Sequence, residues 1–119
     1  MSYLDKIAIS MTKQDSVKFF NDFTREHKDS YLLKNSFELL QYPEYNIFYW
    51  KNIQCNDNKD MLWIQDYLRD LDEKGSPIAV SRIGEDPTDC EEWYNDAGEQ
   101  IWAEKLQICR QFAFELESA

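Results

Sequence analysis

The sequence has few of the residues that break or cross-link a chain. Of its 119 residues, three are Gly, three are Pro and three are Cys. So little Gly and Pro, beside 43% hydrophobic residues, excludes a disordered or low-complexity chain. A chain of this length can bury a core without disulfides or metal ions. We therefore expect one folded domain over residues 1–119.

Long apolar runs and paired cysteines are also missing. The longest uncharged runs, such as 45–50, are far too short to span a bilayer, and the first residues lack the basic start and apolar stretch of a secretory signal. Cys55, Cys90 and Cys109 are odd in number and widely spaced, which disfavours a disulfide framework and favours reduced thiols. We expect a soluble, cytoplasmic protein.

The residue types that carry most catalytic chemistry are scarce. The only histidine, His27, has no second His and no nearby Cys, so neither a zinc site nor a histidine-activated nucleophile has local support. We interpret His27 as a solvated residue at a helix end. No glycine-rich loop could hold a phosphate, and like charge from Asp89 and Glu91 disfavours a thiolate at Cys90. We expect no catalytic residue, no metal and no cofactor.

Apolar spacing predicts an α+β fold. Alternation with a period of two marks strands, whereas apolar residues three or four positions apart mark helices. Strands are expected over 7–11, 37–42, 47–53 and 78–83, and helices over about 13–28 and 59–74. This βαββαβ order is the ferredoxin-like split βαβ arrangement, with both helices on one face of an antiparallel sheet.

Several residues indicate where these elements begin and end. Thr12, three residues before Asp15, is a plausible cap of the first helix. Asp57 or Asn58 can cap the second helix, and Gly75 is well placed to end it.

The sequence also predicts which faces of the first helix and the third strand are apolar. In the first helix, Val17, Phe20 and Phe23 recur at a spacing of three, with Phe19 four before Phe23, and predict an apolar stripe. Residues 43–46 predict a tight hairpin turn. Both faces of 47–50 are aromatic or aliphatic, so the third strand is expected centrally in the sheet, or with one face exposed for binding.

Residues 85–119 follow the expected core of 1–84 as an acidic C-terminal extension packed on it. Turn-forming residues at 95–98 predict a second hairpin between 91–94 and 100–103. Apolar residues at even positions from 106 to 116 favour a final strand. A helix through Ile101, Lys105, Ile108 and Phe112 is the alternative, and patterning leaves both open.

Positive charge is absent from one long segment. Between Ile83 and Glu104 stand eight acidic residues without a Lys or Arg, and they carry −8 of the formal −10. Ordinary surfaces mix the two signs, and concentrated like charge opposes folding, so this segment favours a contact surface. An acidic chain is repelled by phosphate backbones and anionic membranes. The expected partner is a basic protein, without direct binding to nucleic acid or membrane.

Aromatic residues and a second acidic row complete the predicted site. Trp93, Tyr94 and Trp102 are interface anchors or core residues, and the sequence leaves both readings open. On the second helix, three acids stand about one turn apart, roughly 5–6 Å, which resembles the spacing of phosphates. The alternative is that they form an ordinary solvated outer face, and Arg69 and Lys74 reduce the negative charge of the row. The candidate partner-binding residues are Glu85, Asp86, Asp89, Glu91, Glu92, Trp93, Tyr94, Asp96, Glu99, Asp66, Asp70 and Glu73.

Three functions follow from these features. The leading hypothesis is a non-enzymatic inhibitor that covers the basic surface of a nucleic-acid-handling protein, its carboxylates standing where phosphates would lie. In size and charge alone the chain is similar to small acidic anti-restriction and anti-CRISPR proteins of phages. The second hypothesis is an immunity protein that neutralises a toxin nuclease. The third is a small enzyme using a carboxylate pair, such as Glu91 and Asp96, or a metal.

Overall fold

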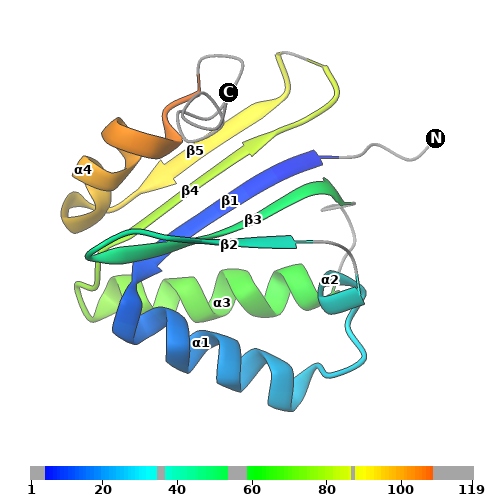
Figure 1. Ribbon diagram of the computed structural model, residues 1–119. Helices are drawn as coiled ribbons and strands as arrows, with labels where there is room; N and C mark the ends of the chain where they lie inside the picture. The colour runs from blue at the N-terminus through cyan, green and yellow to red at the C-terminus, as the bar shows by residue number, and fades with distance from the viewer. Residues whose placement is uncertain (1–4, 35–36, 54–58, 87, 109–119) are drawn as a thin grey trace.

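A computed structural model describes residues 5–34, 37–53, 59–86 and 88–108 (Figure 1). Its strands are β1 (Asp5–Thr12), β2 (Phe37–Gln41), β3 (Tyr45–Ile53), β4 (Ile78–Ile83) and β5 (Cys90–Tyr94). Its helices are α1 (Lys13–Glu26), α2 (Tyr31–Lys34), α3 (Lys59–Glu73) and α4 (Glu99–Ile101). A 3-10 turn, η1 (Asp96–Gly98), precedes α4, and a π-helical turn, η2 (Trp102–Leu106), follows it.

The five strands form one antiparallel sheet in the order β2-β3-β1-β4-β5. The predicted single α+β domain and the predicted order of its first elements are confirmed, because β1, α1, β2, β3, α3 and β4 follow one another as expected. The short α2 is an addition to that order. Since β5 pairs with β4, the two edges of the sheet are β2 and β5.

Both faces of the sheet are covered, by different elements. Helices α1 and α3 lie on one face, and α4 lies on the other (Figure 1). The larger core, on the α1 and α3 side, comprises Ile7, Ile9, Met11, Phe19, Phe23, Leu32, Phe48, Trp50, Ile53, Met61, Ile64, Leu68, Leu71 and Ile78. The smaller core, on the α4 side, comprises Ala8, Ile47, Tyr49, Ala79 and Leu106. Strand β1, and β3 from Ile47 to Trp50, alternate between these cores because of the period of a strand. A register shift between the pairs Asp5/Ile53 and Ile7/Trp50 then brings Ile53 into the larger core.

The predicted helix boundaries hold where the structure describes them. The Thr12 hydroxyl accepts a hydrogen bond from the Asp15 N–H at 3.1 Å and so caps α1. Gly75, with φ of +78°, ends α3: its N–H donates to the Asp72 carbonyl at 2.9 Å, and the Ser76 N–H donates to the Leu71 carbonyl at 3.0 Å. The cap predicted at residues 57–58 lies outside the described residues.

The hairpin between β2 and β3 is confirmed, closed by a hydrogen bond from the Tyr42 N–H to the Tyr45 carbonyl at 3.0 Å. Residues 47–50 are buried on both faces, which makes β3 an interior strand as predicted. The predicted stripe of α1 is wrong for Val17 and Phe20. Phe19 and Phe23 point into the core, whereas Val17 and Phe20 are exposed on the side of the helix beside β2. Each residue step rotates a side chain by about 100°, so Phe19 and Phe20 face different directions.

The C-terminal extension differs most from its prediction. The hairpin expected between 91–94 and 100–103 is wrong: residues 90–94 pair with β4, and a Gly84 N–H to Asp89 carbonyl hydrogen bond of 2.7 Å closes that hairpin. Residues 99–106 are helical, so the favoured strand is wrong at Leu106, and the helical alternative holds as far as that residue. Packing on the second face of the sheet decides between the two patterns. Residues 109–119 lie outside the described residues.

Candidate binding surface at the β5 edge

Strand β5 is an exposed edge strand. All five of its residues are exposed, and Trp93 keeps 43% of its surface accessible. Side chains alternate along a strand, so Glu91 and Trp93 point to the α3 side of the sheet, whereas Glu92 and Tyr94 point to the α4 side. The acidic strand therefore divides its charge between two faces.

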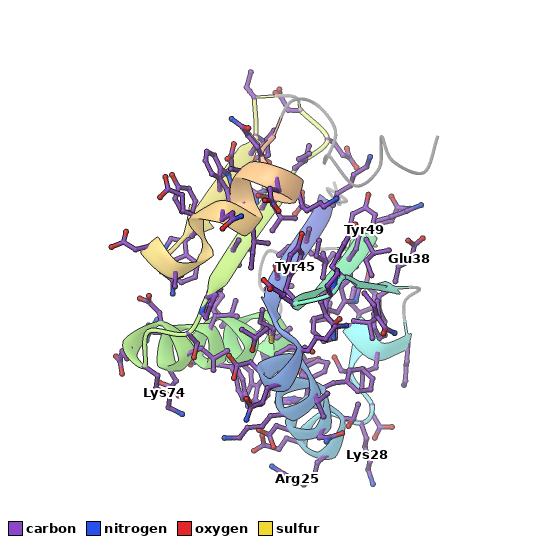
Figure 2. All side chains as sticks on the ribbon, turned by 60° about the vertical axis from the view of Figure 1, so that its left-hand side comes forward. Arg25, Lys28, Glu38, Tyr45, Tyr49 and Lys74 are labelled. Atoms are coloured by element: carbon purple, nitrogen blue, oxygen red, sulfur yellow. The ribbon has the colours of Figure 1, made fainter. Side chains whose placement is uncertain are left out.

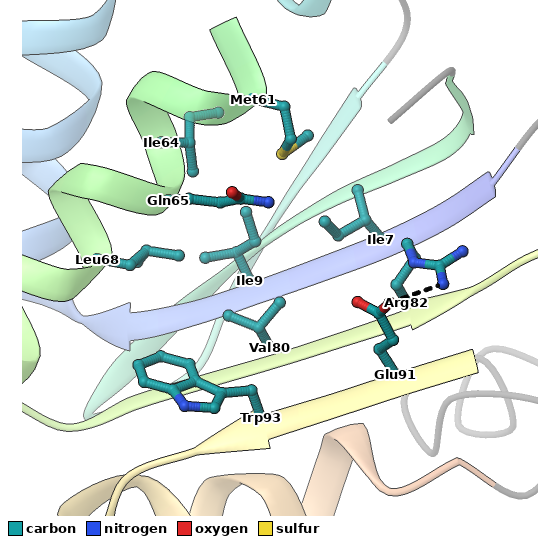
Figure 3. Close-up of a pocket in the computed structure, with 10 residues that line it drawn as sticks. All are labelled: Ile7, Ile9, Met61, Ile64, Gln65, Leu68, Val80, Arg82, Glu91 and Trp93. Atoms are coloured by element: carbon teal, nitrogen blue, oxygen red, sulfur yellow. Dashed lines mark ion pairs between the residues drawn. The ribbon is translucent and has the colours of Figure 1, made fainter. Parts of the chain in front are cut away.

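A groove lies between α3 and β5 (Figure 3). One hollow of this groove measures about 240 Å³ and is lined by Ile7, Ile9, Met61, Ile64, Gln65, Leu68, Val80, Arg82, Glu91 and Trp93. An adjoining hollow of about 350 Å³ extends it toward Arg69 and Asp72. The groove exists because β5 widens the sheet beyond the two helices that cover this face (Figure 1). Its floor is apolar and its rim is polar.

Arg82 on β4 holds three carboxylates at one end of this groove. The guanidinium, in a side chain only 16% exposed, lies 3.4 Å from Asp5, 2.8 Å from Asp89 and 3.2 Å from Glu91. The hydrogen bonds to Asp89, above all, raise the pKa of Arg82 beyond its usual range despite burial. The same contact lowers the pKa of Asp89 below its ordinary 3.8. Two of the eight segment acids thus share, together with Asp5, one cation that lies one residue before Ile83.

Other acids of the segment also have structural partners. Asp86 accepts hydrogen bonds from the N–H and the hydroxyl of Thr88, both at 2.9 Å, which lowers its pKa and closes the β4–β5 turn. Glu85 is exposed in the same turn. Glu92 accepts a hydrogen bond from the indole N–H of Trp102. The Trp102 ring stacks on Tyr94 at 4.4 Å between ring centres, so these aromatics hold β5 to the helical segment behind it.

Asp96 and Glu99 behave differently from these acids. Both are exposed, and within the described ranges their side chains form no ion pair and no hydrogen bond. They sit where the chain turns from β5 into α4. Their carboxylates are therefore available to a partner without loss of an internal contact.

Asn95 fixes the position of that turn. Its amide donates to the Asp72 carboxylate at 3.1 Å and to the Ser76 carbonyl at 2.6 Å, and its oxygen accepts from the N–H groups of Ile78 and Gly98 at 3.1 and 2.9 Å. The sequence identifies Asn95 only as a turn former. Three of its four contacts join residues 17 to 23 positions apart, which no local pattern reveals.

The acidic row of α3 lies apart from the groove. Asp66, Asp70 and Glu73 are exposed as predicted, but none of them lines either hollow. At 100° per residue they lie about a third of a turn around α3 from the residues that do. Asp66 also pairs with Arg69 at 3.4 Å, in a contact exposed on both sides. The two predicted acidic features are thus not brought onto one surface.

The chemistry of the described residues is sparse. Glu91 and Asp96 do not share a site, because residues 91 and 94 alone are about 10 Å apart along the strand. Cys90 is exposed and free. In the described part of the chain, no group of three or more His, Cys, Asp or Glu side chains could hold a metal ion.

His27 is less solvated than predicted. It caps the C-terminus of α1, but its Nδ1 lies 3.0 Å from Asp60, which also accepts a hydrogen bond from the Ser30 hydroxyl. Its ring packs against Phe23 and Trp63. These contacts tie the end of α1 to the start of α3.

Comparison with known proteins finds no family model, no curated protein and no solved structure that matches this chain. Within the described residues, no helix is long and apolar enough to cross a membrane. Function is therefore inferred from the chemistry of the surface.

Proposed function

We propose that this protein is a non-enzymatic inhibitor that binds the basic surface of a nucleic-acid-handling protein through its β5 edge and the turn into α4. The observation that carries the proposal is the exposure of Trp93 on an acidic edge strand beside an apolar groove. A large exposed ring, on the same edge as the exposed carboxylates of Asp96 and Glu99, combines the anchor and the charge that a basic partner requires.

Each part of the surface would have its own role. An aliphatic side chain of the partner enters the groove beside Trp93, while Lys or Arg residues meet Asp96 and Glu99. The net charge of −10 attracts a basic protein over long range and speeds encounter, whereas the buried apolar contact determines how long the complex lasts. A partner that normally binds phosphates offers such a basic surface.

Fewer carboxylates are available to imitate phosphates than the net charge implies. Asp86, Asp89, Glu91 and Glu92 already have internal partners, which leaves Asp96 and Glu99 as the acids of this edge best able to take the place of phosphates. The α3 row supplies a second, separate acidic surface that a large partner would reach.

Affinity capture from a lysate of the source cells, with identification by mass spectrometry, tests this proposal. Capture should weaken at high salt and should compete with added DNA or RNA. The double variant Asp96→Lys with Glu99→Lys should lose capture. The control is Glu26→Lys with Asp29→Lys, which changes the net charge equally at two exposed acids, one at the C-terminal end of α1 and one just beyond it.

Three outcomes separate the alternatives. Loss of capture in both double variants would mean that net charge, and not this edge, is responsible. Capture that is unchanged by added DNA or RNA would contradict mimicry of nucleic acid. A captured toxin nuclease would identify an immunity protein that uses the same surface.

A further inference from the structure

The opposite edge of the sheet carries a groove of a different character. It lies between α1 and β2, measures about 240 Å³, and is lined by Ser16, Val17, Phe20, Asn21, Phe37, Leu39, Asn46 and Phe48. None of these residues is charged, in a chain of which 30% is charged. The two edges of the sheet are therefore chemically unlike.

The rim of this groove is apolar and exposed. Val17 on α1 keeps 60% of its surface accessible and Leu39 on β2 keeps 44%. Between them the partly exposed ring of Phe20 packs on Phe37 and Phe48, with ring centres 6.1 and 6.2 Å away. These ring contacts hold the apolar surface in place, so little side-chain freedom would be lost on covering it.

We propose that β2 and the α1/β2 groove form the interface between two copies of this chain. The distribution of charge favours a second copy of the chain as the occupant of this groove. A second copy also carries −10, so it is repelled from the acidic β5 edge, whereas the uncharged groove offers an approach without local repulsion. A highly charged partner gains no complementary charge there. A second copy brings the same apolar groups, as an isologous two-fold contact requires.

The geometry of an edge strand suits this contact. Alternate residues of β2 turn their N–H and C=O groups away from β3, and within the described residues no further strand pairs with that side. Antiparallel pairing of β2 with its copy, about a two-fold axis through Leu39, would make one sheet of the two. Both α1 helices would then lie on the same face, and Val17, Phe20 and Leu39 of each copy would meet across the axis.

The other face of β2 adds no net charge to this interface. Glu38 lies opposite Tyr49 of β3, two residues labelled in Figure 2, and its carboxylate is 3.5 Å from the Lys51 ammonium. The pair neutralises itself within one copy. Because β2 and β5 are opposite edges of the sheet, the proposed contact leaves the β5 edge uncovered.

Sedimentation velocity of the full chain, across a wide range of concentrations, tests this inference. We expect a species of twice the 14.3 kDa of one chain. Leu39→Lys and, separately, Val17→Lys should each raise the dimer dissociation constant at least about tenfold, because each would bury a charge twice at the axis. Leu62→Lys replaces an apolar residue of α3 that is 58% exposed and lies outside the groove, and it should leave the dimer intact.

Salt distinguishes this contact from association through charged edges. Added salt should leave the dimer unchanged or strengthen it, because it screens the repulsion between two acidic chains. A single-chain mass at every concentration would overturn the inference. So would a dimer that survives both groove variants, or one that Leu62→Lys dissociates equally. Circular dichroism checks the fold of each variant, and the two groove variants lie on different elements, so unfolding of one leaves the other decisive.

Discussion

Arg82 of β4 lies directly opposite Glu91 of β5, and its guanidinium is 3.2 Å from that carboxylate. The same guanidinium contacts Asp5, whose side chain is only 4% exposed, and Asp89 in the β4–β5 turn. One cation therefore joins β1, β4 and β5. Part of the acidity of the β5 edge stabilises the fold and is not available to a partner.

Arg82→Met should lower the free energy of unfolding by about 3 kcal/mol, because it leaves the Asp5 carboxylate buried without its cation. Urea denaturation at neutral pH measures the loss. Lys51→Met is the matched control, since its pair with Glu38 is more than half exposed and should contribute less than about 1 kcal/mol. Equal losses in the two variants would contradict the structural role of Arg82.

Asp89→Asn should destabilise the protein in a pH-dependent way. The pKa of Asp89 is lower in the folded protein than its ordinary 3.8, so unfolding takes up a proton at acid pH. Its stabilising effect is full above the ordinary pKa and is lost as the pH falls through the lower, folded-state value. Urea midpoints of the two proteins should differ at neutral pH and converge in acid. A difference that persists in acid would instead implicate the turn backbone.

Gly98→Ala should destabilise the protein by about 2 kcal/mol or more, because overpacking against a fixed backbone is relieved only by moving it. A Cβ at this position would lie 2.0 Å from the Ile78 carbonyl oxygen. Thermal unfolding measures the effect. Ala97→Ser, at the exposed neighbouring position, should change the melting temperature little. A stable Gly98→Ala protein would mean that η1 does not pack on β4 as described.

Trp93→Ala should affect partner capture, whereas Trp102→Ala should affect stability. Trp93 is exposed at the groove, so its loss should weaken partner capture and barely change the melting temperature. Trp102 stacks on Tyr94 and packs against the smaller core, so its loss should lower the melting temperature. A collapse in stability on removing Trp93 would place that ring in the core and remove it from the proposed surface.

Local patterns were sufficient to predict the first four strands and both long helices. Apolar periodicity, the Thr12 cap and Gly75 each act within a few residues, and all three agree with the structure. The same local information failed for residues 99–106. Turn-forming residues at 95–98 favour a hairpin strand over 100–103, and apolar residues at even positions from 106 favour a further strand. The four-residue spacing of Ile101 and Lys105 fits a helix, and packing on the second face of the sheet decides between them.

In the candidate site, too, local features were predictable and long-range contacts were not. Exposure of the acids on β5 accords with the sequence, which marks charge directly. For Trp93 the sequence leaves core and interface open, and only the structure shows that the ring is exposed. The Arg82 contacts and the Asn95 contacts were not predicted, because both depend on which strand lies beside which. The register of β4 with β5 would have revealed Arg82, since it places that residue opposite Glu91.

The position of β2 and β5 at opposite edges of the sheet has a consequence for valency. With strands about 4.8 Å apart, two copies joined through β2 would hold their β5 strands about 43 Å apart, at the two ends of a ten-stranded sheet. Such a pair could engage two basic sites of one oligomeric partner at once. The second contact would then form at a high effective concentration, and modest affinity at each edge would become strong avidity.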